Sequence, residues 1–385
     1  MNFFNFTVCK ALLITSSFFI LLLSQFQSQA QSEFDKECGV TYFEEMRQKR
    51  FPGRNLIMEF EQWMDHKQNE RLENFGQIQL FANQEKIYKI PVVIHVLHKG
   101  ESYGQGTNIP DEQILAQIDI LNEDFRRQNE DAINTPERFL PVAADVGIEF
   151  VLAGTDPDGN PTNGIIRKQG TRNIWAQPNS QEISNNSFWP SEDYLNIWVA
   201  DLTFGVIGWA QFPDSDLPGI EPSLGRTTDG VVIDYELFGT GGSARTTSLG
   251  RTATHEVGHF FGLRHTWGDG GCDVDDFCLD TPNMSSPSTG CDPERESCGE
   301  ITMVQNYMDY SSDACMNLFT LDQKGRMLTV IENSPRRQSL LNSPGLIDAN
   351  ESFTDLSITS LISPDIATCE NGFEAKIRIR NIGTE

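Results

Sequence analysis

The sequence predicts an α+β fold in which a mixed sheet carries a backing helix and an active-site helix, followed by a loop-rich lower part. Strand-like runs recur at 87–97, 146–153, 195–202 and 229–235, and a run of helical periodicity follows the first of them. A second helix ends in a histidine-rich motif, after which regular periodicity gives way to loops. This arrangement indicates one sheet covered by helices.

Residues 1–30 have the layout of a secretory signal peptide. A basic residue precedes the largely apolar run 11–23, which has thirteen residues and is too short to span a bilayer. Ser28 and Ala30 fill the two small-residue positions of a cleavage site, so we expect cleavage after Ala30. The protein would then be secreted and extracellular, with no membrane segment after signal removal. An uncleaved anchor is the alternative.

Residues 31–86 are predicted to be a propeptide. They are polar and charged, with an amphipathic helical stretch around Met58 to Met64 and no strand pattern. Their release would require a cut between roughly Arg71 and Lys89, made by the chain itself or by another protease.

Residues 87–340 are predicted to form one catalytic domain. The alternating apolar strand 87–97 opens it, and the helix 110–127 follows, with apolar residues at i, i+4, i+7 and i+11 from Ile114. The helix 246–261 comes after the last predicted strand and carries the motif that decides the chemistry.

That motif holds three of the six histidines within eleven residues. His255 and His259 are four residues apart, so a helix places both imidazoles on one face, where they can bind the same ion. Gly262 permits the chain to turn, and His265 can then approach that ion from another direction. Three histidines leave a fourth position for water, as in a catalytic zinc site, and Glu256 can reach that water as a general base. A shorter motif with His255, Glu256 and His259 alone could be a helix face with ordinary histidines. The full motif, which includes Gly262 and His265, is far more specific and favours the metal site.

A second motif follows at 305–310, where Met308 stands in a short polar turn and Tyr310 comes two residues later. Together with the histidine motif, this order resembles the pappalysin family of metzincin zinc metallopeptidases, in particular its bacterial ulilysin-like branch. The resemblance spans roughly residues 87–335. Further family-like stretches lie at 90–97, 109–125, 195–200, 208–213 and 229–233.

The resemblance implies a metzincin-like catalytic domain. In this family Met308 would form the Met-turn beneath the metal, and Tyr310 would stabilise the transition state. It also implies two disulfides, Cys272–Cys298 and Cys291–Cys315. Cys278 is then left over, which keeps the pairing open.

Five aspartates lie within the segment 269–282, four of them within the eight residues 273–280, and such an oxygen-rich irregular sequence is of the kind that binds calcium. The resemblance implies Asp276 and Thr281 as calcium ligands, and Asp275 and Asp280 could add to them. A solvated acidic loop is the alternative.

Cys38 precedes a glycine in the predicted propeptide. A thiolate is a strong zinc ligand, so Cys38 could occupy the open position and displace the water, which would make the protein a latent zymogen. An unpaired or intermolecular thiol is the alternative reading.

Residues 353–385 read as alternating strands and resemble the start of an immunoglobulin-like β-sandwich. Two strands cannot form a stable sandwich alone, so we expect a domain that is cut short here. The formal charge of −26 argues against a nucleic-acid partner, because phosphate repels so acidic a surface.

We therefore expect a secreted zinc-dependent metalloendopeptidase with calcium as a second cofactor. Its partners would be protein or peptide substrates and its own propeptide. Family members tend to cut before Arg or Lys, using an acid near the Met-turn; Asp309 and Asp313 lie there, although Ala314 could occupy that position. The alternative is a catalytically silent secreted adhesion or binding protein on the same scaffold, which is disfavoured because every catalytic position is filled.

Overall fold

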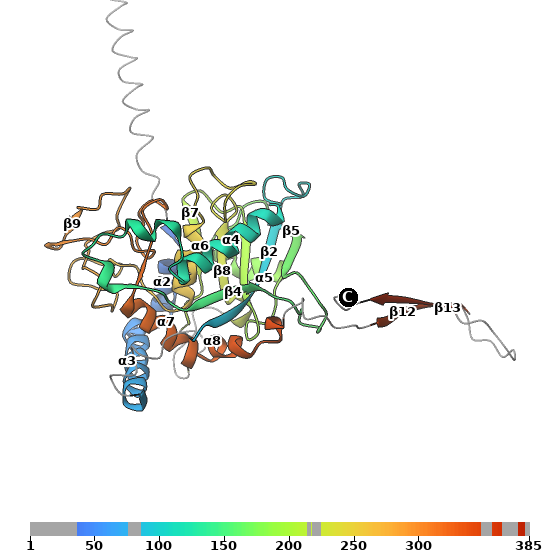
Figure 1. Cartoon of the computed structure of the whole chain (residues 1–385), viewed down its shortest axis with the longest axis horizontal. Helices are drawn as coiled ribbons and strands as arrows, with labels where there is room; N and C mark the ends of the chain where they lie inside the picture. The colour runs from blue at the N-terminus through green and yellow to red at the C-terminus, as the bar shows by residue number, and fades with distance from the viewer. Residues whose placement is uncertain are drawn as a thin grey trace, which may run out of the picture. The chain divides into compact units, whose positions relative to one another are not determined.

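The computed structural model describes residues 37–75, 86–213, 217, 225–347, 356–363 and 376–381 (Figure 1). Apart from Glu37, all of these belong to one compact unit, Cys38–Glu385. The predicted signal peptide, 1–30, lies outside the described residues. No helix of the described part of the chain is long and apolar enough to cross a membrane.

A seven-stranded mixed sheet forms the centre of the fold, in the order β1-β7-β8-β6-β2-β4, with β5 also paired to β2. Strands β4 and β5 pair with successive halves of β2, and β2, β4, β5, β6 and β8 run parallel while β7 is antiparallel to β8. The strands are β1 (Glu37–Cys38), β2 (Tyr88–His98), β4 (Ile148–Leu152), β5 (Ile165–Gln169), β6 (Leu195–Ala200), β7 (Val206–Ala210) and β8 (Gly230–Asp234). The mixed sheet and its four predicted strands are confirmed. Strands β1, β5 and β7 are additions, and β1 corrects the expectation that 31–86 contains no strand: it is only two residues long and forms through pairing with β7 at the sheet edge.

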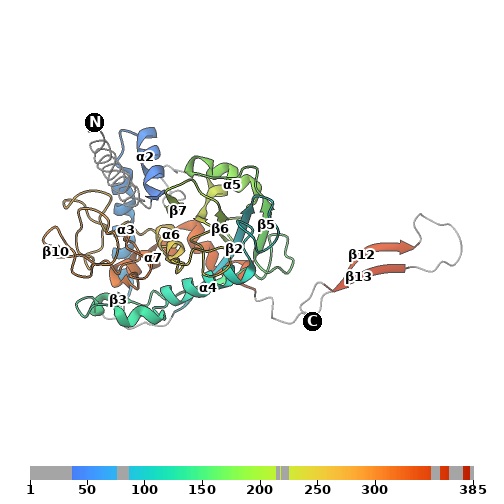
Figure 2. The same ribbon diagram turned by 90° about the horizontal axis from the view of Figure 1, so that it is seen from above.

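Helices α4 and α6 lie side by side and pack against this sheet (Figure 2). The α-helices are α2 (Val40–Arg50), α3 (Leu56–Phe75), α4 (Asp111–Phe125), α5 (Ser180–Asn186), α6 (Arg251–Phe260), α7 (Leu321–Asn333) and α8 (Pro335–Ser339). Short 3-10 helices occur at Glu130–Asn134, Leu140–Val142, Gln177–Asn179, Arg226–Thr228, Leu340–Asn342 and Pro344–Leu346. Helix α6 begins later than the predicted 246, because Gly250 adopts a left-handed conformation with φ 74° just before it.

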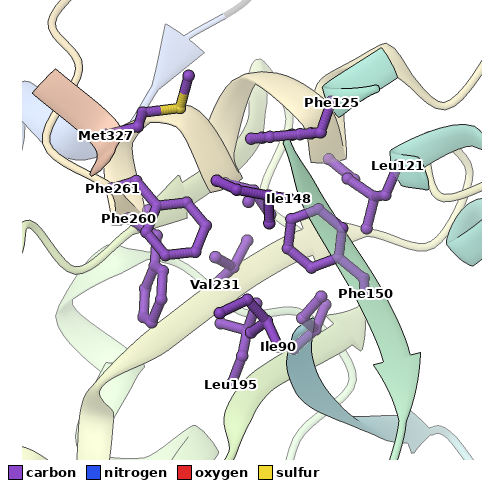
Figure 3. Close-up of a cluster of buried hydrophobic side chains, with 14 of the residues drawn as sticks. Ile90, Leu121, Phe125, Ile148, Phe150, Leu195, Val231, Phe260, Phe261 and Met327 are labelled. Atoms are coloured by element: carbon purple, nitrogen blue, oxygen red, sulfur yellow. The ribbon is translucent and has the colours of Figure 1, made fainter. Parts of the chain in front are cut away.

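The main core lies between the sheet and helices α4 and α6 (Figure 3). Phe125 of α4 packs its ring 5.0 Å from Phe150 of β4 and 4.9 Å from Phe319. Phe260 and Phe261, at the end of α6, are buried in the same cluster. Each such side chain contributes about 1.5–3 kcal/mol of burial free energy, so the helix that carries the histidines is firmly fixed to the sheet.

The lower part, after α6, is rich in loops as predicted. Its regular elements before α7 are the two-residue strands β9 (Glu296–Ser297), β10 (Glu300–Ile301) and β11 (Phe319–Thr320), of which β11 pairs with β3 (Ala143–Ala144). Two disulfides cross-link it, Cys272–Cys298 and Cys291–Cys315, and these are the pairs that the resemblance implied. Near the C-terminus, β12 (Leu356–Ser363) and β13 (Lys376–Asn381) form an antiparallel pair. A sandwich built on them remains a prediction.

Candidate metal centre

Helix α6 and the turn after it bring the three motif histidines together. His255 and His259 project from one face of the helix, with their Nε2 atoms 3.1 Å apart. Gly262 has φ 86°, the left-handed conformation that a turn here requires. His265 follows, and its Nε2 atom lies 3.1 Å from that of His259. Three ring nitrogens thus converge on one point.

Cys38 supplies a fourth donor atom. Its Sγ and one ring nitrogen of each histidine all lie within 4.8 Å of one another, and all four residues are buried. In a tetrahedral zinc site, neighbouring nitrogen and sulfur ligands are about 3.3–3.6 Å apart. The donor set of three imidazoles and one thiol therefore fits zinc.

The far ring nitrogens of the histidines are held by acceptors. Nδ1 of His255 lies 2.7 Å from the carbonyl of Tyr307, and Nδ1 of His259 lies 2.7 Å from the carbonyl of Leu263. Burial, together with its two histidine neighbours, lowers the pKa of His259. These contacts orient both rings so that their Nε2 atoms face the shared point, the orientation in which imidazoles bind a cation.

His265 has two supports that the sequence did not reveal. Asp269 Oδ1 lies 2.6 Å from Nδ1 of His265, and the Trp267 ring stacks on the imidazole at 4.2 Å and 7°. Carboxylate–histidine pairs of this kind orient metal ligands and raise their basicity. An aspartate four residues after the last histidine is the signal that could have found this contact.

Glu256 is completely buried beside the histidines. Its Oε2 accepts a hydrogen bond from the Cys38 thiol at 3.3 Å. Burial raises the pKa of Glu256 to about 8, while burial and the neighbouring Glu256 carboxylate raise the pKa of the Cys38 thiol. A bound divalent cation would oppose both shifts, because it stabilises negative charge nearby.

Tyr310 closes the site from the Met-turn side. Its hydroxyl accepts a hydrogen bond from the Cys38 backbone N–H at 2.9 Å, and its ring packs 5.1 Å from that of His265. Burial raises the pKa of Tyr310 above its ordinary value, so the phenol stays protonated. The hydroxyl therefore keeps an O–H that it could donate beside the histidines.

Met308 is fully buried under helix α6. A Cβ placed on Gly258, the first glycine of the motif, would lie only 2.5 Å from the Met308 Sδ, so a side chain at this position would push Met308 away from the helix. The sequence pattern alone gives no reason for a glycine at position 258. Its role is to let the helix and the turn beneath it touch.

Gly258→Ala is expected to destabilise the protein by about 1–3 kcal/mol, because the added methyl overpacks the contact with Met308. Gly325→Ala is the matched control: this glycine also lies in a helix, α7, but a Cβ there meets nothing within 4 Å. The control should stabilise the protein by about 0.5–1 kcal/mol. Chemical denaturation of both variants measures the two effects, and equal free energies of unfolding would refute the contact.

In the acidic loop, 269–282, only two of the four predicted calcium ligands, Asp276 and Thr281, contact each other through their side chains. Thr281 Oγ1 donates to Asp276 Oδ1 at 2.7 Å, and Asp276 Oδ2 is buried without a partner. Burial raises the pKa of Asp276 to about 7. Asp280 uses Oδ2 to accept the N–H of Asp322, with its buried Oδ1 unpartnered, and Asp275 accepts the N–H of Phe277. The unpartnered carboxylate oxygens are what a hard cation would satisfy.

Comparison with known proteins identifies the family. The family model described as Pregnancy-associated plasma protein-A matches residues 178–332. An extracellular metalloprotease of Colletotrichum graminicola is 34% identical over 243 residues, which cover 62% of this chain and 74% of that protein. Extracellular metalloprotease 1 of Coccidioides posadasii is 33% identical over 252 residues, which cover 64% of this chain and 78% of that protein.

Solved structures agree in both sequence and fold. Mature mirolysin of Tannerella forsythia, in complex with a cleaved peptide, is 42% identical with a TM-score of 0.61, over 67% of this chain and 97% of that one. A mutant of promirolysin from the same organism is 39% identical with a TM-score of 0.62, over 75% of this chain and 96% of that one. The chain belongs to the pappalysin family and is a secreted, extracellular metalloendopeptidase.

Proposed function

We propose that the chain is a zinc endopeptidase made as a latent zymogen. The proposal is carried by one observation: three buried imidazoles, the Glu256 carboxylate and the Cys38 thiol meet at a single point. His255, His259 and His265 would hold the zinc. Three histidine nitrogens and one thiol make four donors, as in a tetrahedral zinc site. This set favours zinc over calcium or magnesium, which prefer oxygen ligands.

When bound, zinc would polarise the scissile carbonyl and make a water molecule acidic. Glu256 would take the proton of that water at its carboxylate and later give it to the leaving amine. Tyr310 would donate its O–H to the negative charge that develops on the carbonyl oxygen. Its hydroxyl is positioned beside His265 and becomes available once the Cys38 backbone N–H leaves it.

The position of Cys38 supports the proposed latency. The thiol occupies the side of the histidines where water must bind, and the backbone of Cys38 engages Tyr310. The next residue, Gly39, donates its N–H to the Gly208 carbonyl of β7 at 2.9 Å, which fixes the segment along the sheet edge. Activation would require removal of residues 31–86, by a cut in the segment between Arg71 and Lys89.

Tyr310→Phe is expected to lower kcat on casein by about ten- to a hundredfold with little change in KM, because the hydroxyl acts only on charge that develops in the transition state. Steady-state kinetics of the processed enzyme measure this. A rise in KM with kcat unchanged would assign Tyr310 to substrate binding instead.

We also propose cleavage before Arg or Lys, on the resemblance to the family. Of the two acids near the Met-turn, Asp313 accepts the N–H groups of Leu249 and Arg251, and Asp309 Oδ1 accepts those of Ser288 and Tyr310. A digest of a peptide library by the processed enzyme should enrich Arg and Lys immediately after the cut several-fold. A flat distribution at that position removes the preference.

Calcium is proposed to bind at Asp276 and Thr281, with Asp275 and Asp280 as further ligands. The support is the buried, unpartnered oxygens of Asp276 and Asp280. Calcium there would tie the cross-linked loop to the first turn of α7, whose Asp322 N–H already contacts Asp280.

One experiment tests the proposed function as a whole. The purified chain is stripped with a chelator, then given zinc, calcium or both, and casein cleavage and the N-terminal sequence of the chain are followed together. We expect activity to depend on zinc, to be strengthened by calcium, and to appear as residues 31–86 are lost. A chain that binds zinc but never cleaves casein would favour the alternative of a silent binding protein.

A further inference from the structure

A second cluster of buried charges lies next to the metal centre and takes no part in the chemistry. The carboxylate of Glu61, on α3, is bound by Arg326 of α7 through two parallel contacts, Nη1 to Oε2 at 2.7 Å and Nη2 to Oε1 at 2.9 Å. Arg264, immediately before the ligand His265, adds its Nε to Oε1 at 3.0 Å. Arg264 also binds Glu44 of α2 through Nη1 at 2.7 Å.

This cluster is shielded from water. The side chains of Arg264, Arg326 and Glu61 are only 6%, 3% and 3% exposed. The guanidinium of Arg264 lies 5.1 Å from the centre of the Phe212 ring. Charges buried this deeply are costly unless paired, and losing one partner of such a pair is strongly unfavourable because the other charge stays buried and uncompensated.

The two sides of the cluster belong to different parts of the chain. Within the described residues, both acids that form ion pairs with these arginines, Glu44 and Glu61, come from the proposed propeptide. Asp276 contributes a longer-range attraction to Arg326. Removal of the propeptide would therefore leave two arginines of the catalytic domain without their carboxylates.

Apolar contacts surround the charges. Phe60, next to Glu61, packs its ring 4.8 Å from Phe212, and Met64 is fully buried one turn later. Gly262, in the turn of the zinc motif, is near enough that a Cβ there would lie 3.4 Å from the Phe60 ring and 2.9 Å from Val330. The same face of α3 thus presents two apolar side chains and one carboxylate to a matching surface.

We propose that this surface, named here the arginine groove and formed by Arg264, Arg326, Phe212, Gly262 and Val330, is an exosite that retains the propeptide after the chain is cut. The cleaved segment would remain an inhibitor in trans until it is digested, with Glu61 as its main point of recognition. The bidentate grip of Arg326 gives the specificity for a carboxylate. This inference rests on the proposed zymogen function, and it adds a second point of attachment that does not involve the metal.

The test uses the full chain with a recognition site for a sequence-specific protease placed between residues 76 and 85. Glu256→Ala is included so that the released segment is not digested. After the cut, the dissociation rate constant of the N-terminal fragment is measured by dilution and size-exclusion chromatography. We expect Glu61→Gln to raise this rate constant about 30-fold or more, because it leaves the buried Arg326 without its carboxylate and Arg264 with Glu44 alone.

Glu59→Gln is the matched control. Glu59 lies on the same helix but pairs with Arg54 of the propeptide itself, so its loss should change the rate constant less than threefold. Glu44→Gln removes a carboxylate from Arg264 alone, so the dissociation rate constant should rise three- to tenfold. This second variant tests the proposal even if Glu61→Gln does not fold. Immediate loss of the fragment from the parent chain, or equal rates for Glu59→Gln and the two groove variants, would overturn the proposal.

The outcome is separable from that of the proposed latency. If Cys38 does not block the metal, Cys38→Ala leaves the activity of the uncut chain unchanged, while the effect of Glu61→Gln on dissociation persists. If only the proposed role of the arginine groove is wrong, Cys38→Ala makes the uncut chain active and Glu61→Gln leaves the dissociation rate constant unchanged.

Discussion

Glu256→Ala is expected to abolish measurable proteolysis of casein, a loss of about 10³- to 10⁴-fold in kcat, while the chain still binds one zinc. The carboxylate is buried beside the three histidines, and its Oε2 accepts a hydrogen bond from the Cys38 thiol, which we propose stands where water would bind. In the proposed site Glu256 is not a zinc ligand. Its removal should therefore lower kcat and leave the zinc content unchanged. Activity and zinc content are measured on the same sample, the latter by atomic emission.

The control for this variant is Glu300→Ala, which removes an exposed glutamate of the short strand β10. It should retain full activity and full zinc content. Near-normal activity of Glu256→Ala would refute the mechanism. Loss of zinc together with activity would instead make Glu256 a ligand or a structural support.

Cys38→Ala is expected to make the uncut chain active, raising its rate of peptide cleavage about tenfold or more. Tenfold corresponds to about 1.4 kcal/mol, which is less than a zinc–thiolate bond contributes. Among the described residues of the proposed propeptide, Cys38 is the only one that belongs to the group that could hold a metal, and the variant removes its thiol. A small quenched peptide is the right substrate, with gel analysis to show that the chain remains uncut during the assay.

Cys278→Ala provides the comparison for this prediction. Cys278 is likewise a free, buried cysteine, but it lies in the acidic loop and belongs to no group with the histidines. Its replacement should leave the uncut chain latent. If both variants stay inactive until they are cut, latency would depend on the helices of the propeptide and not on its thiol.

Much of the fold could be predicted from the sequence because the signals are local. The strands β2, β4, β6 and β8 are short apolar runs, and α4 shows helical spacing from Ile114 onward. The histidine motif fixes its own geometry, since a four-residue spacing on a helix and a glycine turn already direct His255, His259 and His265 to one point. In the structure the Nε2 atoms of the three histidines lie close together, as the spacing predicts.

Other features depend on parts of the chain that are distant in sequence. Strand β7 is brief, contains Gly208, and pairs antiparallel with β8, so its own residues give only a weak strand pattern. The support of His265 by Trp267 and Asp269 depends on how the loop folds back after the motif. The pairing of Glu61 with Arg326 spans 265 positions, and many other charge pairings are equally compatible with the sequence.

X-ray absorption at the zinc edge, recorded on the uncut and the processed chain, tests the central claim most directly. The account predicts three nitrogen scatterers and one sulfur in the uncut chain, and three nitrogens with one oxygen and no sulfur after processing. An uncut chain whose zinc shows no sulfur ligand would contradict it, and so would a processed chain that still shows one.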